Sequence, residues 1–367
     1  MKADVYKIGA VLPFSGSEAH SGAQCLNGAG MAVEEINESG GVLGGRPIEL
    51  VVEDSETDPQ RALERTRKLV EADGVQAVLG PLLSTSRDLM IEYLAEHRIP
   101  LLYGTDYEGG ACNRYLFCYS AIPEHYARPV VPHMIKHYGG AFYLLGSDYV
   151  WPRKTNAYVK GILAQKGATL SGEEYFPFGH EDFRPALDRI AESGAAVVFL
   201  DLVDLELRTF LRQCHESGLK EKIRIVALAF NEGTLASLHR EEAEGVLTCN
   251  HFFATLDCPE AREFVKRQKT MFGEDTWVSY YNVSHYGLIR LFGQAVNGAG
   301  TEDVEKIVDA MADRSLVVAN GRVTMRGSDH HMILNIVVAE VKGGRLTLVK
   351  EVDFLAPADQ CADERTV

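Results

Sequence analysis

Short apolar runs alternate with longer amphipathic stretches along the first two thirds of the chain. A run such as Tyr6 to Leu12 is bounded by polar and turn-forming residues, which is typical of a buried strand. The stretches between such runs repeat apolar or small residues every three to four positions, which predicts helices. In the first part of the chain, strands are expected at 6–12, 48–52, 77–79 and 100–103. Strands and helices alternating at this spacing predict βαβ units and a mainly parallel sheet.

The same alternation starts again after Pro123 and predicts a second half of similar construction. Its strands are expected at 142–145, 169–175, 196–200 and 223–228. Beyond residue 258 two helical stretches are followed by strand-like segments at 322–325, 332–341 and 346–352. The fold class is therefore α/β, with two doubly wound lobes. The altered pattern at the end suits a chain that crosses between the lobes more than once.

Size and charge narrow the range of partners. A chain of 367 residues is long for one hydrophobic core and predicts two domains. The formal net charge is -15 and no Lys/Arg-rich run offsets it, so nucleic acid is not expected as a partner. No apolar stretch has the length of a transmembrane helix, so membrane insertion is not expected either.

The seven cysteines show neither a CxxC spacing nor a zinc-type pattern. Cys112 and Cys118 are close enough for a local disulfide, with buried reduced thiols as the alternative. The sequence begins at Met1 with no leader-like segment. The odd cysteine count and this start favour a cytoplasmic protein, and a periplasmic protein whose leader was removed is the alternative.

The segment 146–153, with the sequence GSDYVWPR, is the first candidate for binding chemistry. It follows the strand at 142–145 and precedes a helix expected at 154–165. Ligands of open α/β sheets bind beyond the carboxyl ends of the strands, where this segment would lie. Tyr149 and Trp151 each combine a large apolar face with one polar group, so they are predicted to wall a pocket. Packing within the domain is the alternative for both rings.

Motifs for catalysis and cofactor binding are missing from the sequence. There is no GxGxxG fingerprint, no phosphate-binding GxxxxGKS/T loop, no HExxH and no GxSxG, and no cofactor is expected. A metal site is not expected at His330 and His331, because neighbouring residues of a strand point to opposite faces. Asp201, Asp204 or Glu232 could act as the general base of an enzyme, but no nucleophile is paired with them. No catalytic residue is assigned.

Three segments resemble the type I periplasmic-binding-protein family: 36–48 (INESGGVLGGRPI), 103–109 (YGTDYEG) and 146–153. The last two resemble the branch that contains urea and short-chain-amide receptors and the aliphatic-amidase regulator. The resemblance covers almost the whole chain. It implies two Rossmann-like lobes joined by three hinge crossings, with lobe 1 at 1–121 plus 253–328 and lobe 2 at 122–252 plus 329–367.

The resemblance also implies a non-catalytic receptor that closes its two lobes on a small polar ligand. Ser84, Tyr103 and Thr105 would donate or accept hydrogen bonds from lobe 1. Tyr149 and Trp151 would wall the pocket from lobe 2. The ligand would be a short-chain amide, urea or a relative, and the partner would be either an ABC permease or a cytoplasmic regulator protein of an amidase operon.

Three carboxylates depart from the pattern of an amide pocket. Asp201 and Asp204 stand where the family has small or hydroxyl-bearing residues, and Glu232 follows nearby. Extra carboxylates favour an ammonium group, so an amino acid is the alternative ligand. Its carboxylate would then be held by Ser84 and Thr105, as in an amino-acid-binding protein of a branched-chain-type ABC transporter.

Overall fold

The computed structural model describes residues 5–16 and 18–362, so the expected start at Met1 lies outside the described residues. The chain forms two compact units. Unit 1 consists of the described residues of Met1–Ala121, Cys258–Leu334 and Ala356–Val367. Unit 2 consists of Ile122–Asp257 and Asn335–Leu355.

The chain passes between the units four times, whereas the sequence predicted three crossings. The passages follow Ala121, Asp257, Leu334 and Leu355. Residues 253–257 therefore belong to unit 2, and both 329–334 and 356–362 belong to unit 1, in contrast to the predicted division. The difference at the end of the chain has a physical cause, because covalent and hydrogen bonds tie 356–362 to unit 1.

Unit 1 is built on a five-stranded parallel sheet with the strand order β2-β1-β3-β4-β5. The strands are β1 (Tyr6–Leu12), β2 (Ile48–Asp54), β3 (Ala77–Leu79), β4 (Leu101–Tyr103) and β5 (Leu116–Cys118). The first four lie within two residues of the segments predicted from their apolar runs. β5 was not predicted, because no amphipathic stretch lies between β4 and β5 to mark a connecting helix.

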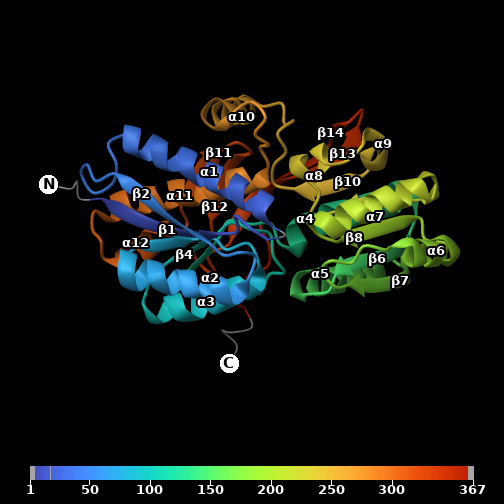
Figure 1. Ribbon diagram of the computed structural model, residues 1–367, viewed down its shortest axis with the longest axis horizontal. Helices are drawn as coiled ribbons and strands as arrows, with labels where there is room; N and C mark the ends of the chain where they lie inside the picture. Colours follow the sequence, from blue (N-terminus) through green and yellow to red (C-terminus); the bar gives the residue numbers. More distant parts are fainter. Residues whose placement is uncertain (1–4, 17, 363–367) are drawn as a thin grey trace. The chain divides into compact units, whose positions relative to one another are not determined.

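Helices cover both faces of the unit 1 sheet, with α2 and α3 together on one face (Figure 1). The helical elements are α1 (Ala19–Glu38), α2 (Pro59–Lys68), a π-helical turn (Leu69–Asp73), α3 (Ser84–Glu96), α10 (Pro259–Phe272), α11 (Tyr280–Ala299) and α12 (Val304–Met311). Asp58 caps α2 as predicted by accepting a bond from the backbone N–H of Arg61 at 2.8 Å. The helices α1 and α11 approach closely at Gly28, where a Cβ atom would lie 2.1 Å from the carbonyl oxygen of Asn282.

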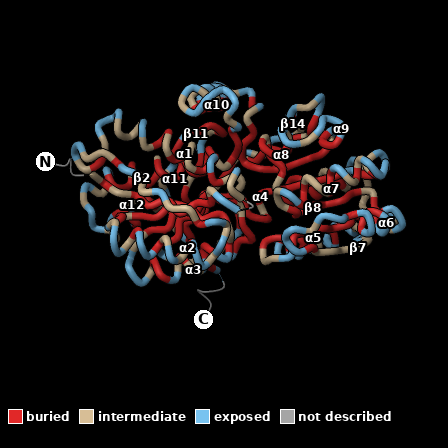
Figure 2. The backbone as a smooth tube through the Cα atoms, viewed as in Figure 1, coloured by how far each residue is buried: buried red, intermediate tan, exposed pale blue. Residues whose placement is uncertain are grey.

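Unit 2 contains a parallel sheet with the strand order β10-β9-β8-β6-β7. Its strands are β6 (Ala141–Ser147), β7 (Thr169–Phe176), β8 (Val197–Asp201), β9 (Arg224–Ala227) and β10 (Leu247–Asn250). Its helices are α4 (Pro123–Tyr138), α5 (Val150–Gln165), α6 (Arg184–Ser193), α7 (Asp204–Glu216), α8 (Glu232–Ala236), α9 (Arg240–Ala243) and a 3-10 turn (Leu219–Glu221). Within each unit, central strands such as β1 and β8 are buried, whereas the edge strands β2 and β7 are partly exposed and the helices carry much of the exposed surface (Figure 2).

One strand, β13 (Met332–Lys342), belongs to both units. Its first residues pair with β12 (Gly321–Met325), which forms an antiparallel pair with β11 (Ser315–Val318) in unit 1. Residues 337–340 pair antiparallel with β10 in unit 2. The last strand, β14 (Arg345–Leu355), pairs with β13 after the predicted glycine turn.

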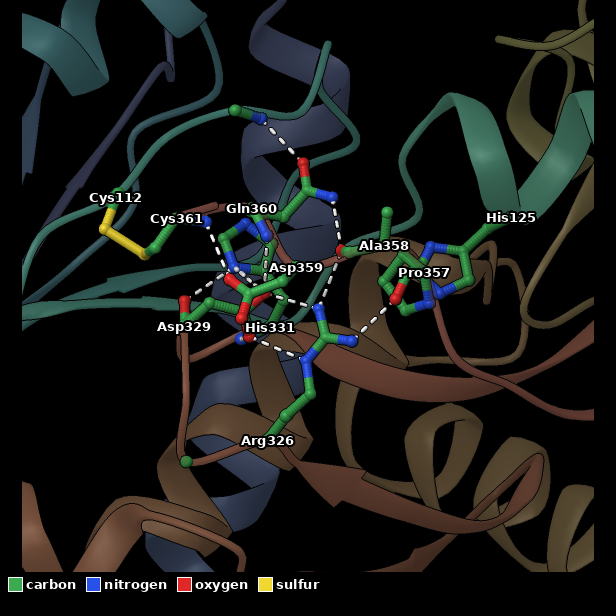
Figure 3. Close-up of polar contacts among 12 residues, drawn as sticks. Cys112, His125, Arg326, Asp329, His331, Pro357, Ala358, Asp359, Gln360 and Cys361 are labelled. Carbon is green, nitrogen blue, oxygen red and sulfur yellow. Dashed lines mark hydrogen bonds and ion pairs between the residues drawn. A yellow bond between two sulfur atoms is a disulfide. The ribbon is translucent and has the colours of Figure 1, made fainter. Parts of the chain in front are cut away.

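The terminal segment 356–362, called the strap below, is fixed to unit 1 (Figure 3). A disulfide joins Cys361 to Cys112. Arg326 donates to the carbonyl oxygens of Pro357, at 2.6 Å, and Ala358, at 2.9 Å. Gln360 accepts a bond from the backbone of Gly110 at 2.7 Å. The strap thereby holds the loop that runs from Thr105 to Cys112.

The disulfide corrects the predicted pairing of cysteines. Cys112 bonds to Cys361 rather than to Cys118, which is free and buried on β5. Burial raises the pKa of the Cys118 thiol to about 12, so the thiol stays protonated. Among the described residues, no helix has the length and apolar character needed to cross a membrane.

Candidate functional site

The three predicted contacts of unit 1 come together at the carboxyl ends of neighbouring strands. β3 pairs with β4, so the loops that follow them meet at one edge of the sheet. The Tyr103 hydroxyl donates to the carbonyl oxygen of Leu82 at 3.1 Å, and the Thr105 hydroxyl donates to that of Pro81 at 3.3 Å. Ser84 opens α3 directly after the first loop. This is the edge at which open α/β sheets bind ligands.

Gly104 lets the loop between Tyr103 and Thr105 lie against α11. A Cβ atom at this position would lie 2.7 Å from the ring of His285. Ser284 donates to the Gly104 carbonyl oxygen at 2.6 Å. Burial lowers the pKa of His285 to about 4, so the ring is neutral and its Nδ1–H donates to Tyr281. The loop is therefore held from behind by a neutral, buried contact.

Two residues that the sequence did not single out, Arg87 and Glu108, complete the polar set of unit 1. Ser84 donates to one carboxylate oxygen of Glu108 at 2.7 Å, and Arg87 donates to the other at 2.9 Å. The guanidinium lies 4.5 Å from the ring centroid of Tyr107 and 5.3 Å from that of Tyr103. Its Nη1 is buried and has no hydrogen-bond partner among the described residues. Glu108 lies in the segment 103–109, so the resemblance of this segment to the family could have pointed to it.

The candidate residues of unit 2 also gather at a carboxyl edge. β8 lies between β6 and β9, and Gly146 on β6 is paired with Asp201 on β8. Asp204 begins α7 after β8, and Glu232 begins α8 after β9. Asp204 forms an ion pair with Arg208 at 2.9 Å, so its charge is already balanced.

Asp201 and Glu232 are carboxyl groups whose surroundings leave them unsatisfied. Asp201 is fully buried, and neither of its oxygens has a hydrogen-bond partner among the described residues. Burial alone raises its pKa well above the usual range. Glu232 accepts a bond from the backbone of Ala254 at 2.5 Å, while its Oε2 is buried without a partner. Burial raises the pKa of Glu232 to about 7, although the Ala254 N–H opposes the rise.

Tyr149 and Trp151, the two predicted pocket walls of unit 2, differ in their surroundings. The helix α5 begins at Val150 and not at residue 154 as predicted, so Trp151 is helical and only Tyr149 remains in the loop. Trp151 is 5% exposed and its indole N–H donates to Tyr126 at 2.9 Å, so this polar group is used in packing α5 against α4. Tyr149 is half-buried, and its ring lies 5.3 Å from that of the exposed Phe178. A role of either ring in binding stays a prediction.

The described residues contain no group of three or more His, Cys, Asp or Glu side chains placed to hold a metal ion. His330 stacks on Phe117 with 4.3 Å between the ring centroids. The Nδ1–H of His331 donates to the Asp329 carbonyl oxygen at 2.7 Å, and its Nε2 accepts from Tyr107. Both histidines therefore act in packing within unit 1.

Two α/β units, each with polar side chains at the carboxyl edge of a parallel sheet, define a class of small-molecule-binding proteins. A family model described as "Periplasmic binding protein" matches residues 5–345. The chain belongs to the periplasmic-binding-protein family.

Relatives and solved structures agree with this membership over nearly the whole chain. A "Leu/Ile/Val-binding protein homolog 6" of Brucella suis is 26% identical over 347 residues, which cover 92% of this chain and 88% of the relative. A "Leucine-, isoleucine-, valine-, threonine-, and alanine-binding protein" of Pseudomonas aeruginosa is 22% identical over 338 residues, which cover 88% of this chain and 86% of the relative.

Among solved structures, an amino acid ABC transporter substrate-binding protein from Pseudomonas fluorescens Pf-5 has a TM-score of 0.89 at 20% identity, covering 99% of this chain and all of the other. A solute-binding protein from Rhodopseudomonas palustris HaA2, solved with p-hydroxybenzoic acid, has a TM-score of 0.90 at 20% identity, covering 96% and 98%. These structures share the fold, and the predicted α/β class with its type I periplasmic binding fold is confirmed. None of these four proteins is described as a urea or amide receptor. The urea and amide branch therefore stays a prediction from the sequence.

Proposed function

We propose that the protein is a non-catalytic receptor that delivers an amino acid to an ABC importer. The observation that carries the proposal is the buried Oε2 of Glu232, which has no hydrogen-bond partner among the described residues. An ionised carboxylate is stable in such a place only with a positive partner. A ligand ammonium supplies that charge. This ligand class is supported by relatives named as a Leu/Ile/Val-binding protein homolog and as a leucine-, isoleucine-, valine-, threonine- and alanine-binding protein.

The polar groups of both units contribute to binding in this proposal. Each unit carries its own candidate binding groups: Ser84 and Thr105 in unit 1, and Tyr149 and Glu232 in unit 2, where Asp201 adds a second carboxyl group next to β6. Asp204 contributes less, because Arg208 already balances its charge. No residue acts as a catalytic base, in keeping with a family of binding proteins.

A screen by thermal unfolding tests the ligand class. L-Leucine, L-isoleucine, L-valine, L-threonine, L-alanine, 4-hydroxybenzoate, acetamide and urea are compared at equal concentration. A ligand present at a hundredfold over its Kd adds about 2.7 kcal/mol to the free energy of unfolding, which is readily seen as a rise in Tm. If no amino acid in the set raises the Tm, the proposal is wrong.

Protons taken up or released on binding separate a charged ligand from a neutral one. An ammonium group binds ionised Glu232, so binding below pH 7 must release a proton, and Kd rises by about tenfold for each pH unit below the pKa. Isothermal titration in buffers of different ionisation enthalpy measures this release. Glu232→Gln abolishes it, whereas Glu206→Gln, at another buried carboxylate of unit 2, leaves it in place. A ligand that binds without proton release excludes the ammonium contact.

A short-chain amide or urea is the second candidate ligand. It is supported by the segment 103–109, with Tyr103 at the end of β4 and Thr105 in the loop that follows, and by the half-buried ring of Tyr149. Such a ligand would also permit the regulatory role, in which the receptor binds a partner protein instead of a permease. Binding of acetamide or urea in the same screen, without any amino acid, would favour this candidate.

We also propose that the protein works in an oxidising compartment such as the periplasm. The support is the Cys112–Cys361 disulfide, since disulfides are rare in the reducing cytoplasm. Protein denatured without reductant should then expose five alkylatable thiols, because five of the cysteines are free. Alkylation of all seven, counted by mass spectrometry in protein taken from its native cells, would refute the proposal.

A further inference from the structure

A buried network in unit 1 lies directly behind one of the predicted ligand contacts. Ser84 donates to Glu108 at 2.7 Å, and Arg87 donates to the second oxygen of the same carboxylate at 2.9 Å. The side chains of Arg87 and Glu108 are each 3% exposed, and Ser84 is 3% exposed. Hydrogen bonds to an ionised group are stronger than neutral ones, and exclusion of water strengthens them further. The bond from Ser84 to Glu108 is therefore a fixed feature of the site.

This bond decides what Ser84 can offer to a ligand. A serine hydroxyl has one proton to donate and two lone pairs that accept. An ionised carboxylate can only accept, so the single proton of Ser84 is directed to Glu108. What remains for a ligand is a hydrogen-bond acceptor. Tyr103 and Thr105 likewise donate to the carbonyl oxygens of the loop after β3, so the neighbouring hydroxyls have the same polarity.

Arg87 holds the carboxylate of Glu108 in place. The guanidinium is always charged and lies against the rings of Tyr103 and Tyr107. It also donates from Nη2 to Asp88, at 2.7 Å, but that carboxylate is 62% exposed. Glu108 is thus the buried partner of Arg87, and Asp88 is a solvated partner on the same helix.

We propose that Glu108, positioned by Arg87, determines the specificity of unit 1 by fixing the hydrogen-bond polarity of Ser84. The ligand group that faces Ser84 is then an N–H donor, either the ammonium of an amino acid or the nitrogen of an amide, and not a carboxylate. The inference rests on the proposed function. It reverses the predicted contact in which Ser84 donates to the ligand carboxylate.

The test compares ligands that differ in the donor alone. L-Leucine and 4-methylpentanoate differ by the ammonium group, and acetamide and acetate differ by the amide nitrogen. Each Kd is measured by titration calorimetry for the wild type, Glu108→Gln and Asp88→Asn. In Glu108→Gln the side-chain amide can donate to Ser84 and so frees the serine proton for the ligand. The preference for the N–H member of the bound pair should fall at least tenfold in this variant and stay unchanged in Asp88→Asn.

A double-mutant cycle separates this polarity effect from the simple loss of a negative charge. Ser84→Ala removes the acceptor but keeps Glu108, and it should weaken the N–H ligand on its own. In the Ser84→Ala background, Glu108→Gln should no longer change the preference, because its effect passes through Ser84. A change of equal size in that background would overturn the proposal, as would a wild-type preference that Glu108→Gln leaves intact.

Failure of the proposed function gives a different result. A wild-type protein that binds no member of either pair refutes the amino-acid and amide ligands, and the inference falls with them. Binding with an unmoved preference refutes the inference alone. If Glu108→Gln does not fold because Arg87 loses its buried partner and keeps only the solvated Asp88, Arg87→Gln/Glu108→Gln removes the buried charge and is measured in its place.

Discussion

Loss of the Cys112–Cys361 disulfide should destabilise unit 1 and leave unit 2 nearly unchanged. The cysteines are 249 residues apart, and closing a loop of this length lowers the entropy of the unfolded chain by an amount equivalent to about 5.5 kcal/mol in the chain-entropy model. Measured losses are typically about 2–4 kcal/mol. Unit 2 lies within this loop and shortens the flexible part of it if unit 2 stays folded while unit 1 unfolds. The estimate changes little in that case, because halving the length of a loop changes the free energy of closing it by only about 0.6 kcal/mol.

The chain offers one tryptophan in each unit to follow this. Trp277 belongs to unit 1 and packs edge-on against His20, while Trp151 is buried in unit 2. Urea unfolding in a Trp151→Phe background therefore reports unit 1, and in a Trp277→Phe background it reports unit 2. For an m-value of about 2–3 kcal/mol/M, Cys361→Ser should lower the unit 1 midpoint by about 1 M.

Matched variants show whether the bridge itself is responsible. Cys112→Ser should reproduce the effect of Cys361→Ser, and the double variant should cost no more than either, since all three remove one bond. Cys258→Ser alters a free thiol of unit 1 and should shift the midpoint far less. An unchanged unit 1 midpoint in Cys361→Ser, or an equal shift in both units, would show that the strap is not what stabilises unit 1.

Further predictions concern pH and glycine packing. Because burial raises the folded-state pKa of Glu232 to about 7 from its usual value of 4.5, its contribution to stability is complete below pH 4.5 and is lost as pH rises through 7. This amounts to about 3 kcal/mol at most, and urea titrations should find the loss absent in Glu232→Gln. Asp201→Asn should likewise reduce the loss of stability at rising pH, since burial raises the pKa of Asp201 as well. Gly104→Ala should lower the free energy of unfolding by about 1–3 kcal/mol, because the added methyl group meets the ring of His285. Gly161→Ala, within α5 and with no atom near the added methyl group, should raise it by about 1 kcal/mol. Equal unfolding temperatures of the two variants would contradict this.

Much of the architecture could be predicted because it depends on local patterns. The run from Tyr6 to Leu12 marked β1 at its correct ends, and Asp58 with the following proline marked the start of α2. β5 and β10 were not predicted, although β3 and β4 are equally short, because no long amphipathic stretch precedes either of them to mark a βαβ unit.

Contacts between distant residues could not be predicted in the same way. Cys118 lies six positions from Cys112 and seemed the nearer partner, but the fold places Cys361 there instead. The engagement of Ser84 by Glu108 spans 24 residues and depends on two loops meeting at the sheet edge. Trp151 was expected in the loop before a helix at 154–165, yet α5 begins at Val150, and its Pro152 is well tolerated in the first turn of a helix.

The continuous strand β13 has a consequence for anyone who wishes to dissect the molecule. Residues 122–257 form most of unit 2, yet a fragment ending there would expose β10 as an unpaired edge, since its partner comes from residues 337–340. Open edges of this kind recruit other strands and promote aggregation. Unit 2 should therefore be recovered from a fragment only when a peptide spanning β13 and β14 is supplied with it. That requirement makes the chain suited to a fragment-complementation reporter, in which assembly of the sheet restores the fold.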